Sequence, residues 1–188
     1  MRRWESADLL KVIPLIWKNW ELPSYSAVKK ELMTALYDRD YQKVELDIRN
    51  TLLKWTLKFL QRMPDPPNIV YGSSNISRYC LFSPNDITLS IFKLLNEKKV
   101  LKLSNLRQTE YFQWGSTQLN QPLPYLAILG ENLPIIEILI DNNVMFQTAA
   151  ELTDIRKFFL DYPEKQHVIT FIRNYMRDVI KDRDQAQQ

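Results

Sequence analysis

The sequence predicts an all-α fold, with a helical N-terminal part followed by an irregular stack of helix pairs. Apolar residues recur every three or four positions along most of the chain, as they do in amphipathic helices. Only 3 of the 188 residues are glycine, too few for a β-rich fold with many tight turns. In addition, one segment of the second half aligns without gaps on a later one, which indicates a repeated structural unit.

The N-terminal part, residues 1–63, is predicted to contain three helices. The first begins near Ser6, a residue type that caps helices, and Pro14 is expected to kink it or to start a new turn. The strongest periodicity in the chain covers residues 40–62 and predicts a helix packed on two sides. One apolar face holds Tyr41, Val44, Ile48, Leu52, Trp55 and Phe59, and the other holds Leu46, Leu53, Leu57 and Leu60.

Residues 64–86 are rich in proline and are predicted to connect two helical parts. Prolines, Gly72 and a run of small polar residues disfavour a helix through this segment. Short extended pieces are expected at residues 69–71 and 79–82. The segment separates residues 1–63 from residues 87–188, which form either two domains or two halves of a shared core.

The second half contains the internal repeat. Residues 88–100 align without gaps on residues 132–144, an offset of 44 (132 − 88). The aligned pairs include Leu89 with Leu133, Ile91 with Ile135, Leu94 with Ile138, Leu95 with Leu139 and Val100 with Val144. A third copy of the apolar core follows at Val168, Ile169, Phe171 and Ile172, in the places of Ile135, Ile136, Ile138 and Leu139. Three related helices are therefore expected.

Residues 121–144 resemble the paired helices of an ankyrin repeat, and weaker similarity extends over residues 86–177. Ala127 falls on the small residue of the inner helix. The apolar positions of the outer helix are occupied by Ile135, Ile136, Leu139 and Ile140. Asn143 stands at the exit turn where the family has glycine, and asparagine is the next-best residue for a left-handed conformation. The resemblance implies a stack of helix pairs closed by capping helices, the last from about residue 167 to 184.

The chain also departs from the family pattern. The Thr-Pro-Leu-His entry is replaced by Gln121–Pro124, and the offset of 44 exceeds the usual repeat of about 33 residues. A nonrepetitive helical bundle with the same spacing of Leu and Ile is the alternative.

No catalytic, metal or cofactor site is predicted. The single cysteine, Cys80, lies in an apolar stretch and is interpreted as a buried, inert thiol. The single histidine, His167, begins a helical pattern and is expected to be a capping or surface residue. The alternative is a small hydrolase or transferase whose pocket would gather His167 or a pair of carboxylates with hydrogen-bond donors.

The predicted function is binding of another protein. Residues 101–121 have weak helical periodicity and, in an ankyrin-like stack, form an extended hairpin between repeats. Aromatic residues beside arginine are typical anchors of protein interfaces. The predicted contact residues are Arg107, Tyr111, Phe112 and Trp114 in this segment and Tyr125 on the inner helix. Packing of the three hairpin aromatics onto the core is the equally weighted alternative.

A second hypothesis is nucleic-acid binding through the C-terminal helix. Arg173, Arg177 and Lys181 recur every four residues, and Arg2 with Arg3 add charge at the N-terminus. The net charge of +3 is small for a dedicated DNA-binding protein, so the stripe is better explained as a solvated face. Neither a signal peptide nor a membrane span is expected, which favours the cytoplasm, or the host cytoplasm for a delivered bacterial effector.

Overall fold

The computed structural model describes residues 4–69, 74–107, 109–114 and 117–187, without the side chains of residues 109–114, 117 and 119. The predicted all-α class is confirmed, with one β-hairpin as the exception among the described residues. The chain divides into two compact units. Unit 1 comprises Met1–Cys80 and Asn85–Lys102, and unit 2 comprises Leu81–Pro84 and Leu103–Gln188.

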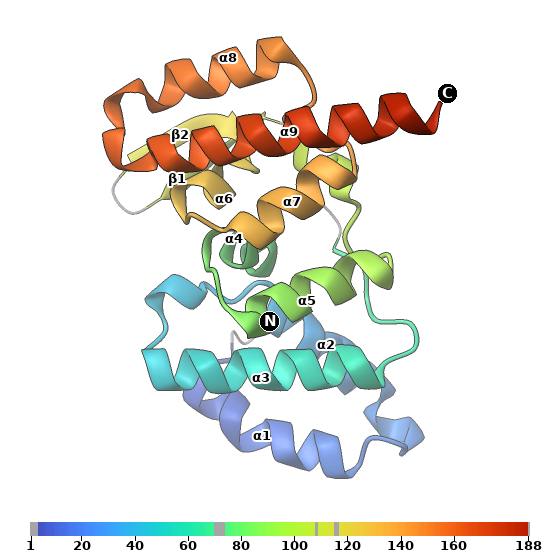
Figure 1. The fold of residues 1–188 in the computed structure, drawn as a ribbon. Helices are drawn as coiled ribbons and strands as arrows, with labels where there is room; N and C mark the ends of the chain where they lie inside the picture. The colour runs from blue at the N-terminus through green and yellow to red at the C-terminus, as the bar shows by residue number, and fades with distance from the viewer. Residues whose placement is uncertain (1–3, 70–73, 108, 115–116, 188) are drawn as a thin grey trace. The chain divides into compact units, whose positions relative to one another are not determined.

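Unit 1 is built around one long central helix, α3. Its elements are α1 (Ser6–Lys18), η1 (Pro23–Tyr25), α2 (Ser26–Tyr37), η2 (Tyr41–Lys43), α3 (Leu46–Arg62), the start of α4 (Asn75–Phe82) and α5 (Asp86–Glu97). Helix α3 packs against α1, α2 and α5, and Figure 1 shows it lying between α1 and α5. Leu52, Leu53, Phe59 and Leu60 are buried, so α3 is packed on two sides as predicted.

Helix α1 runs from Ser6 to Lys18 with Pro14 inside it, so Pro14 does not begin a new helix, and a kink at this residue stays a prediction. One boundary in unit 1 differs from the prediction. Helix α3 begins at Leu46 instead of residue 40, because Tyr41–Lys43 form a 3₁₀ turn and Val44 is extended. Tyr41 is nevertheless buried, and its hydroxyl donates a hydrogen bond of 2.7 Å to the carbonyl of Leu36.

The prediction of an extended piece at residues 79–82 is wrong, because residues 75–82 form helix α4. No proline lies between Pro67 and Pro84, which leaves enough chain for two helical turns. Ile76 and Cys80, one turn apart, are both fully buried, so apolar burial on one face stabilises the helix. The other extended piece was expected at residues 69–71. The N–H of Ile69 donates a hydrogen bond to the carbonyl of Val100, and residues 70 and 71 lie outside the described residues.

The described residues of unit 2 form one hairpin and two helix pairs. Its elements are η3 (Leu103–Arg107), β1 (Thr109–Trp114), β2 (Thr117–Pro122), α6 (Tyr125–Leu129), α7 (Leu133–Asp141), α8 (Ala149–Phe158), η4 (Phe159–Asp161), η5 (Pro163–Lys165) and α9 (Gln166–Ala186). The strands are antiparallel, and α9 packs against both α7 and α8 (Figure 1). Its core includes Leu126, Ile128, Ile135, Leu139, Phe146, Phe159 and Ile172.

The aligned segments have the same local structure. In α5, α7 and α9 the first two positions of the apolar core and the last are buried, and the one between them is half-buried. These positions are Ile91, Phe92, Leu94 and Leu95 in α5, Ile135, Ile136, Ile138 and Leu139 in α7, and Val168, Ile169, Phe171 and Ile172 in α9. The repeat seen in the sequence is therefore also a repeat of burial.

Helices α5 and α7 also end in the same way. Lys99 has φ 59° and Asn143 has φ 55°, so both aligned residues adopt the left-handed conformation predicted for Asn143. The next N–H groups, of Val100 and Val144, each donate 2.9 Å hydrogen bonds to the carbonyls of Leu95 and Leu139. This pattern is a Schellman motif, which normally uses glycine at the left-handed position.

Gly130 lies in the turn between α6 and α7, but it does not supply a left-handed residue. That conformation belongs to Glu131, with φ 54°. Gly130 is required by a close approach instead, because a Cβ atom there would lie 1.8 Å from the carbonyl oxygen of Phe82. The absence of a side chain at Gly130 therefore lets the backbone of this turn lie directly against the backbone at Phe82.

The two units are each discontinuous in sequence, and the predicted segments 1–63, 64–86 and 87–188 stay a prediction. Helix α5 packs against α3 and so belongs to unit 1, although its sequence aligns with α7 of unit 2. The ammonium of Lys98, just after α5, donates hydrogen bonds to the carbonyls of Leu60 and Met63, the second at 2.6 Å. A cation at the end of α3 satisfies free carbonyl groups, and this links α5 to α3.

Candidate binding surfaces

The predicted binding segment forms a β-hairpin. The strand register pairs Tyr111 with Asn120, Phe112 with Leu119 and Trp114 with Thr117. The side chains of Tyr111, Phe112 and Trp114 lie outside the described residues, so their exposure stays a prediction. In the described part of the chain β1 and β2 form a two-stranded sheet, which leaves the outer edge of each strand without a partner strand.

Arg107 lies at the base of the hairpin and is half exposed. Its guanidinium lies 3.4 Å from a carboxylate oxygen of Glu151. The other oxygen of Glu151 accepts a 2.6 Å hydrogen bond from the N–H of Gln147, while Thr148 caps α8 by accepting from the N–H of Glu151. Arg107 is thus tied to the start of α8, with part of its side chain exposed to solvent.

Tyr125, which was predicted to contact a partner, is buried. It is 4% exposed, because α8 and η4 cover α6 with two phenylalanines. Its ring centroid is 5.2 Å from that of Phe158, edge to face, and 5.8 Å from that of Phe159. Burial, followed by the charges of Asp154 and Glu151, raises the pKa of Tyr125 to about 12. Tyr125 is a core residue of unit 2.

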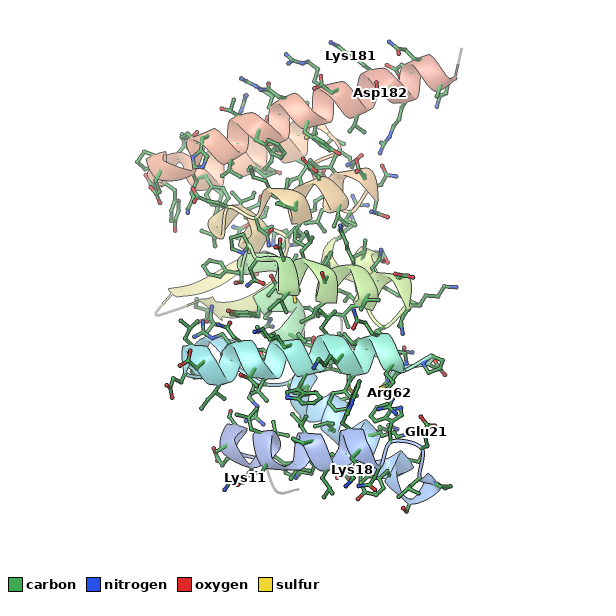
Figure 2. All side chains as sticks on the ribbon, turned by 60° about the horizontal axis from the view of Figure 1, so that its bottom comes forward. Lys11, Lys18, Glu21, Arg62, Lys181 and Asp182 are labelled. Carbon is green, nitrogen blue, oxygen red and sulfur yellow. The ribbon has the colours of Figure 1, made fainter. Side chains whose placement is uncertain are left out.

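The C-terminal basic residues are exposed but are mixed with acids. Arg173, Arg177 and Lys181 lie on the solvent side of α9, and Figure 2 shows Lys181 near the far end of this helix beside Asp182. The guanidinium of Arg177 lies 3.9 Å from the carboxylate of Asp178. Arg2 and Arg3 lie outside the described residues. This charge pattern is typical of a solvated helix face.

His167 lies beside a carboxylate at the surface, and Cys80 lies in the core. His167 is 64% exposed in its side chain, and its Nε2 lies 3.0 Å from the carboxylate of Glu131, which Lys165 also approaches at 3.8 Å. Cys80 is fully buried, and burial raises the pKa of its thiol far above the usual range. Within the described residues, three or more His, Cys, Asp and Glu side chains nowhere gather in the way a metal site needs.

A cavity of about 670 Å³ opens in unit 1 between the start of α1 and the end of α2. It is lined by acids, including Glu5, Glu31 and Asp38, and by Arg39 and Lys43. The guanidinium of Arg39 donates a hydrogen bond to the carbonyl of Trp4, and Lys43 pairs with Asp40 at 3.2 Å. Mixed charges of this kind do not specify one ligand chemistry.

A cluster of aromatic rings and cations lies where α1 meets α3 in unit 1. The ring of Trp17 lies edge to face with Trp55 at 5.6 Å and with Phe59 at 5.4 Å, and Trp20 stacks on Phe59 at 5.1 Å. Phe59 and Trp20 are buried, whereas Trp17 and Trp55 are half-buried. We call these four rings and the cations over them, Lys29, Lys58 and Arg62, the cation–aromatic cluster.

The sequence predicted the rings as core residues, and it contained a signal for the rest of the cluster. Trp55 and Phe59 are four residues apart, as are Lys58 and Arg62, so aromatic and basic side chains alternate along one side of α3. Assigning Trp55 and Phe59 to an apolar face alone left out the basic residues beside them.

The described residues contain no helix that is long and apolar enough to span a membrane. Searches against protein-family models, curated proteins and solved structures find no match to this chain.

Proposed function

We propose that this chain is a non-enzymatic protein-binding module whose second half is similar to ankyrin repeats. The observation that carries the proposal is the structural repeat. Helices α5, α7 and α9 share one burial pattern, and α5 and α7 share an uncommon non-glycine Schellman ending. Each follows a shorter helix, giving the pairs α4–α5, α6–α7 and α8–α9. Helix-pair repeats of this kind mostly serve as binding scaffolds.

The proposed contact surface is the hairpin between α5 and α6, with Arg107 at its base. An ankyrin-like stack has a hairpin between successive repeats, and here Thr109–Trp114 and Thr117–Pro122 stand in that place. Tyr111, Phe112 and Trp114 are the proposed anchors, because large aromatic side chains contribute most of the binding energy at protein interfaces. Tyr125 is not part of this surface, since it is buried.

A photo-crosslinking experiment tests this proposal. A benzophenone amino acid at position 111 should capture a defined protein from the native lysate, and replacing Phe112 and Trp114 by alanine should abolish capture. The matched control changes Arg173, Arg177 and Lys181 to alanine, which alters the exposed face of α9 and should leave capture intact. If the α9 variant lost capture and the Phe112 and Trp114 variant kept it, the partner would bind the C-terminal helix and not the hairpin.

A further inference from the structure

We propose that the cation–aromatic cluster of unit 1 binds single-stranded nucleic acid. It is distinct from the hairpin of the proposed protein-binding function and uses none of its residues. Ordered aromatic rings, cations placed against them and a local excess of positive charge together favour this ligand.

The rings form a fixed platform with an accessible side. Phe59 is fully buried beneath the cluster, and it contacts Trp17 at 5.4 Å, Trp20 at 5.1 Å and Trp55 at 5.9 Å. Because three indoles pack around one buried ring, little ordering entropy is lost when a ligand binds them. Trp17 and Trp55 are half-buried, so each residue keeps part of its surface in contact with solvent.

Three cations surround this platform. The guanidinium carbon of Arg62 lies 4.5 Å from the ring centre of Trp17, Lys29 lies 4.3 Å from that of Trp20, and Lys58 lies 4.7 Å from that of Trp55. Arg62 is held in place, because it donates to the carbonyl of Trp17 at 3.1 Å and pairs with Glu21 at 3.4 Å. Figure 2 shows the side chains of Arg62 and Glu21 close together, with Lys18 on the neighbouring α1.

The charge balance favours an anionic partner. Among the described residues, Glu21 is the single carboxylate that pairs with these three cations, and its side chain is 86% exposed. The exposed Lys54 lies one turn before Lys58 on α3 and adds to the positive charge. By contrast, the basic residues of α9 are interleaved with Asp178, Asp182 and Asp184, so that surface is close to neutral.

Half-buried aromatic rings beside cations are the combination that proteins use to bind single strands. Unpaired bases stack on aromatic side chains, and lysines and arginines contact the phosphates between them. Lys58 is exposed and can leave the face of Trp55 for a phosphate when a base takes its place. Duplex DNA keeps its bases stacked inside the helix and would leave the indoles unused.

The test measures fluorescence anisotropy of fluorescein-labelled (dT)20 and (rU)20 with the full chain, at low and at physiological salt. A duplex of the same length and a polyglutamate peptide are the comparison ligands. We expect both single strands to bind with an affinity that falls as salt rises, and the duplex and the peptide to bind at least about tenfold more weakly. Tighter binding of (dT)20 would identify the ligand as DNA, and tighter binding of (rU)20 would identify it as RNA.

Two variants connect the binding to the cluster. Lys58→Glu, on the exposed side of α3, should weaken binding by about tenfold, whereas Lys181→Glu makes the same charge change on α9 and should alter it less than about twofold. Trp55→Phe keeps an aromatic ring and should retain binding, but it should lose part of the tryptophan quenching that the single strand causes. No anisotropy change at low salt, equal binding of polyglutamate, or equal effects of the two lysine variants would overturn the proposal.

Discussion

Helices α5 and α7 have similar sequences and end identically, yet they begin differently and lie in different units. Asn85 precedes α5 and caps it, because its side chain accepts a hydrogen bond of 2.9 Å from the N–H of Thr88. Asn132 precedes α7 without capping it; its amide instead donates to the carbonyl of Leu81 at 3.0 Å and is 2% exposed. The same residue type therefore serves local structure before α5 and tertiary packing before α7.

This difference shows what a repeat in sequence does and does not determine. The shared Leu and Ile spacing sets the buried face of each helix and its left-handed ending, both of which depend on a few neighbouring residues. The surroundings are set by positions at which the two copies differ. Lys98 joins the end of α5 to α3, whereas the aligned Asn142 donates to Ile138 within its own helix.

The largest expected effect concerns the turn before α7. Gly130→Ala should lower the free energy of unfolding by about 3 kcal/mol or more, because the new Cβ atom would overlap the carbonyl oxygen of Phe82 and backbone must move. Urea unfolding followed by circular dichroism measures it. Glu131→Ala, which changes the next residue without adding an atom near Phe82, is the control and should have a small effect. An unchanged midpoint for Gly130→Ala would contradict the packing described for this turn.

The two asparagines should respond differently to the same substitution. Asn132→Asp removes the buried donor to the Leu81 carbonyl and should cost about 2 kcal/mol of unfolding free energy. Asn85→Asp keeps an acceptor for the N–H of Thr88 and should change stability by less than about 0.5 kcal/mol, since aspartate caps helices as well as asparagine does. The unfolding of both variants is compared at neutral pH. Equal losses would mean that the two residues have the same role.

The sequence predicted the helices that have uninterrupted apolar periodicity and the left-handed position of Asn143, because both follow from local spacing and residue type. It missed α4, since the prolines and glycine on either side obscured a short helix whose stability comes from burying Ile76 and Cys80. The burial of Tyr125 was also missed. It depends on Phe158 and Phe159, which are more than thirty residues away in the chain.

Tyr125 offers a test of the core around the helix before α7. Its pKa is raised to about 12 in the folded protein, so the unfolded chain loses this proton first and stability falls as pH rises from 10 towards 12. Tyr125→Phe removes this contribution. At pH 11 the variant should lose about 1 kcal/mol less of its unfolding free energy, relative to pH 8, than the original chain does. If the two proteins lost the same unfolding free energy between pH 8 and pH 11, the Tyr125 hydroxyl would be exposed to water in the folded protein.

The smallest expected effect separates the two otherwise identical helix ends. Lysine carries a steric penalty in the left-handed conformation that asparagine largely avoids, and glycine avoids it altogether. Lys99→Gly should therefore raise the unfolding free energy by about 0.5–1 kcal/mol, and Asn143→Gly by only a few tenths. Glu97→Gly, in the last turn of α5, should instead destabilise by about 0.5–1 kcal/mol, which excludes a general effect of glycine near the helix end. A larger gain at Asn143 than at Lys99 would show that the surroundings of α7, and not the conformation shared with α5, control the stability of its ending.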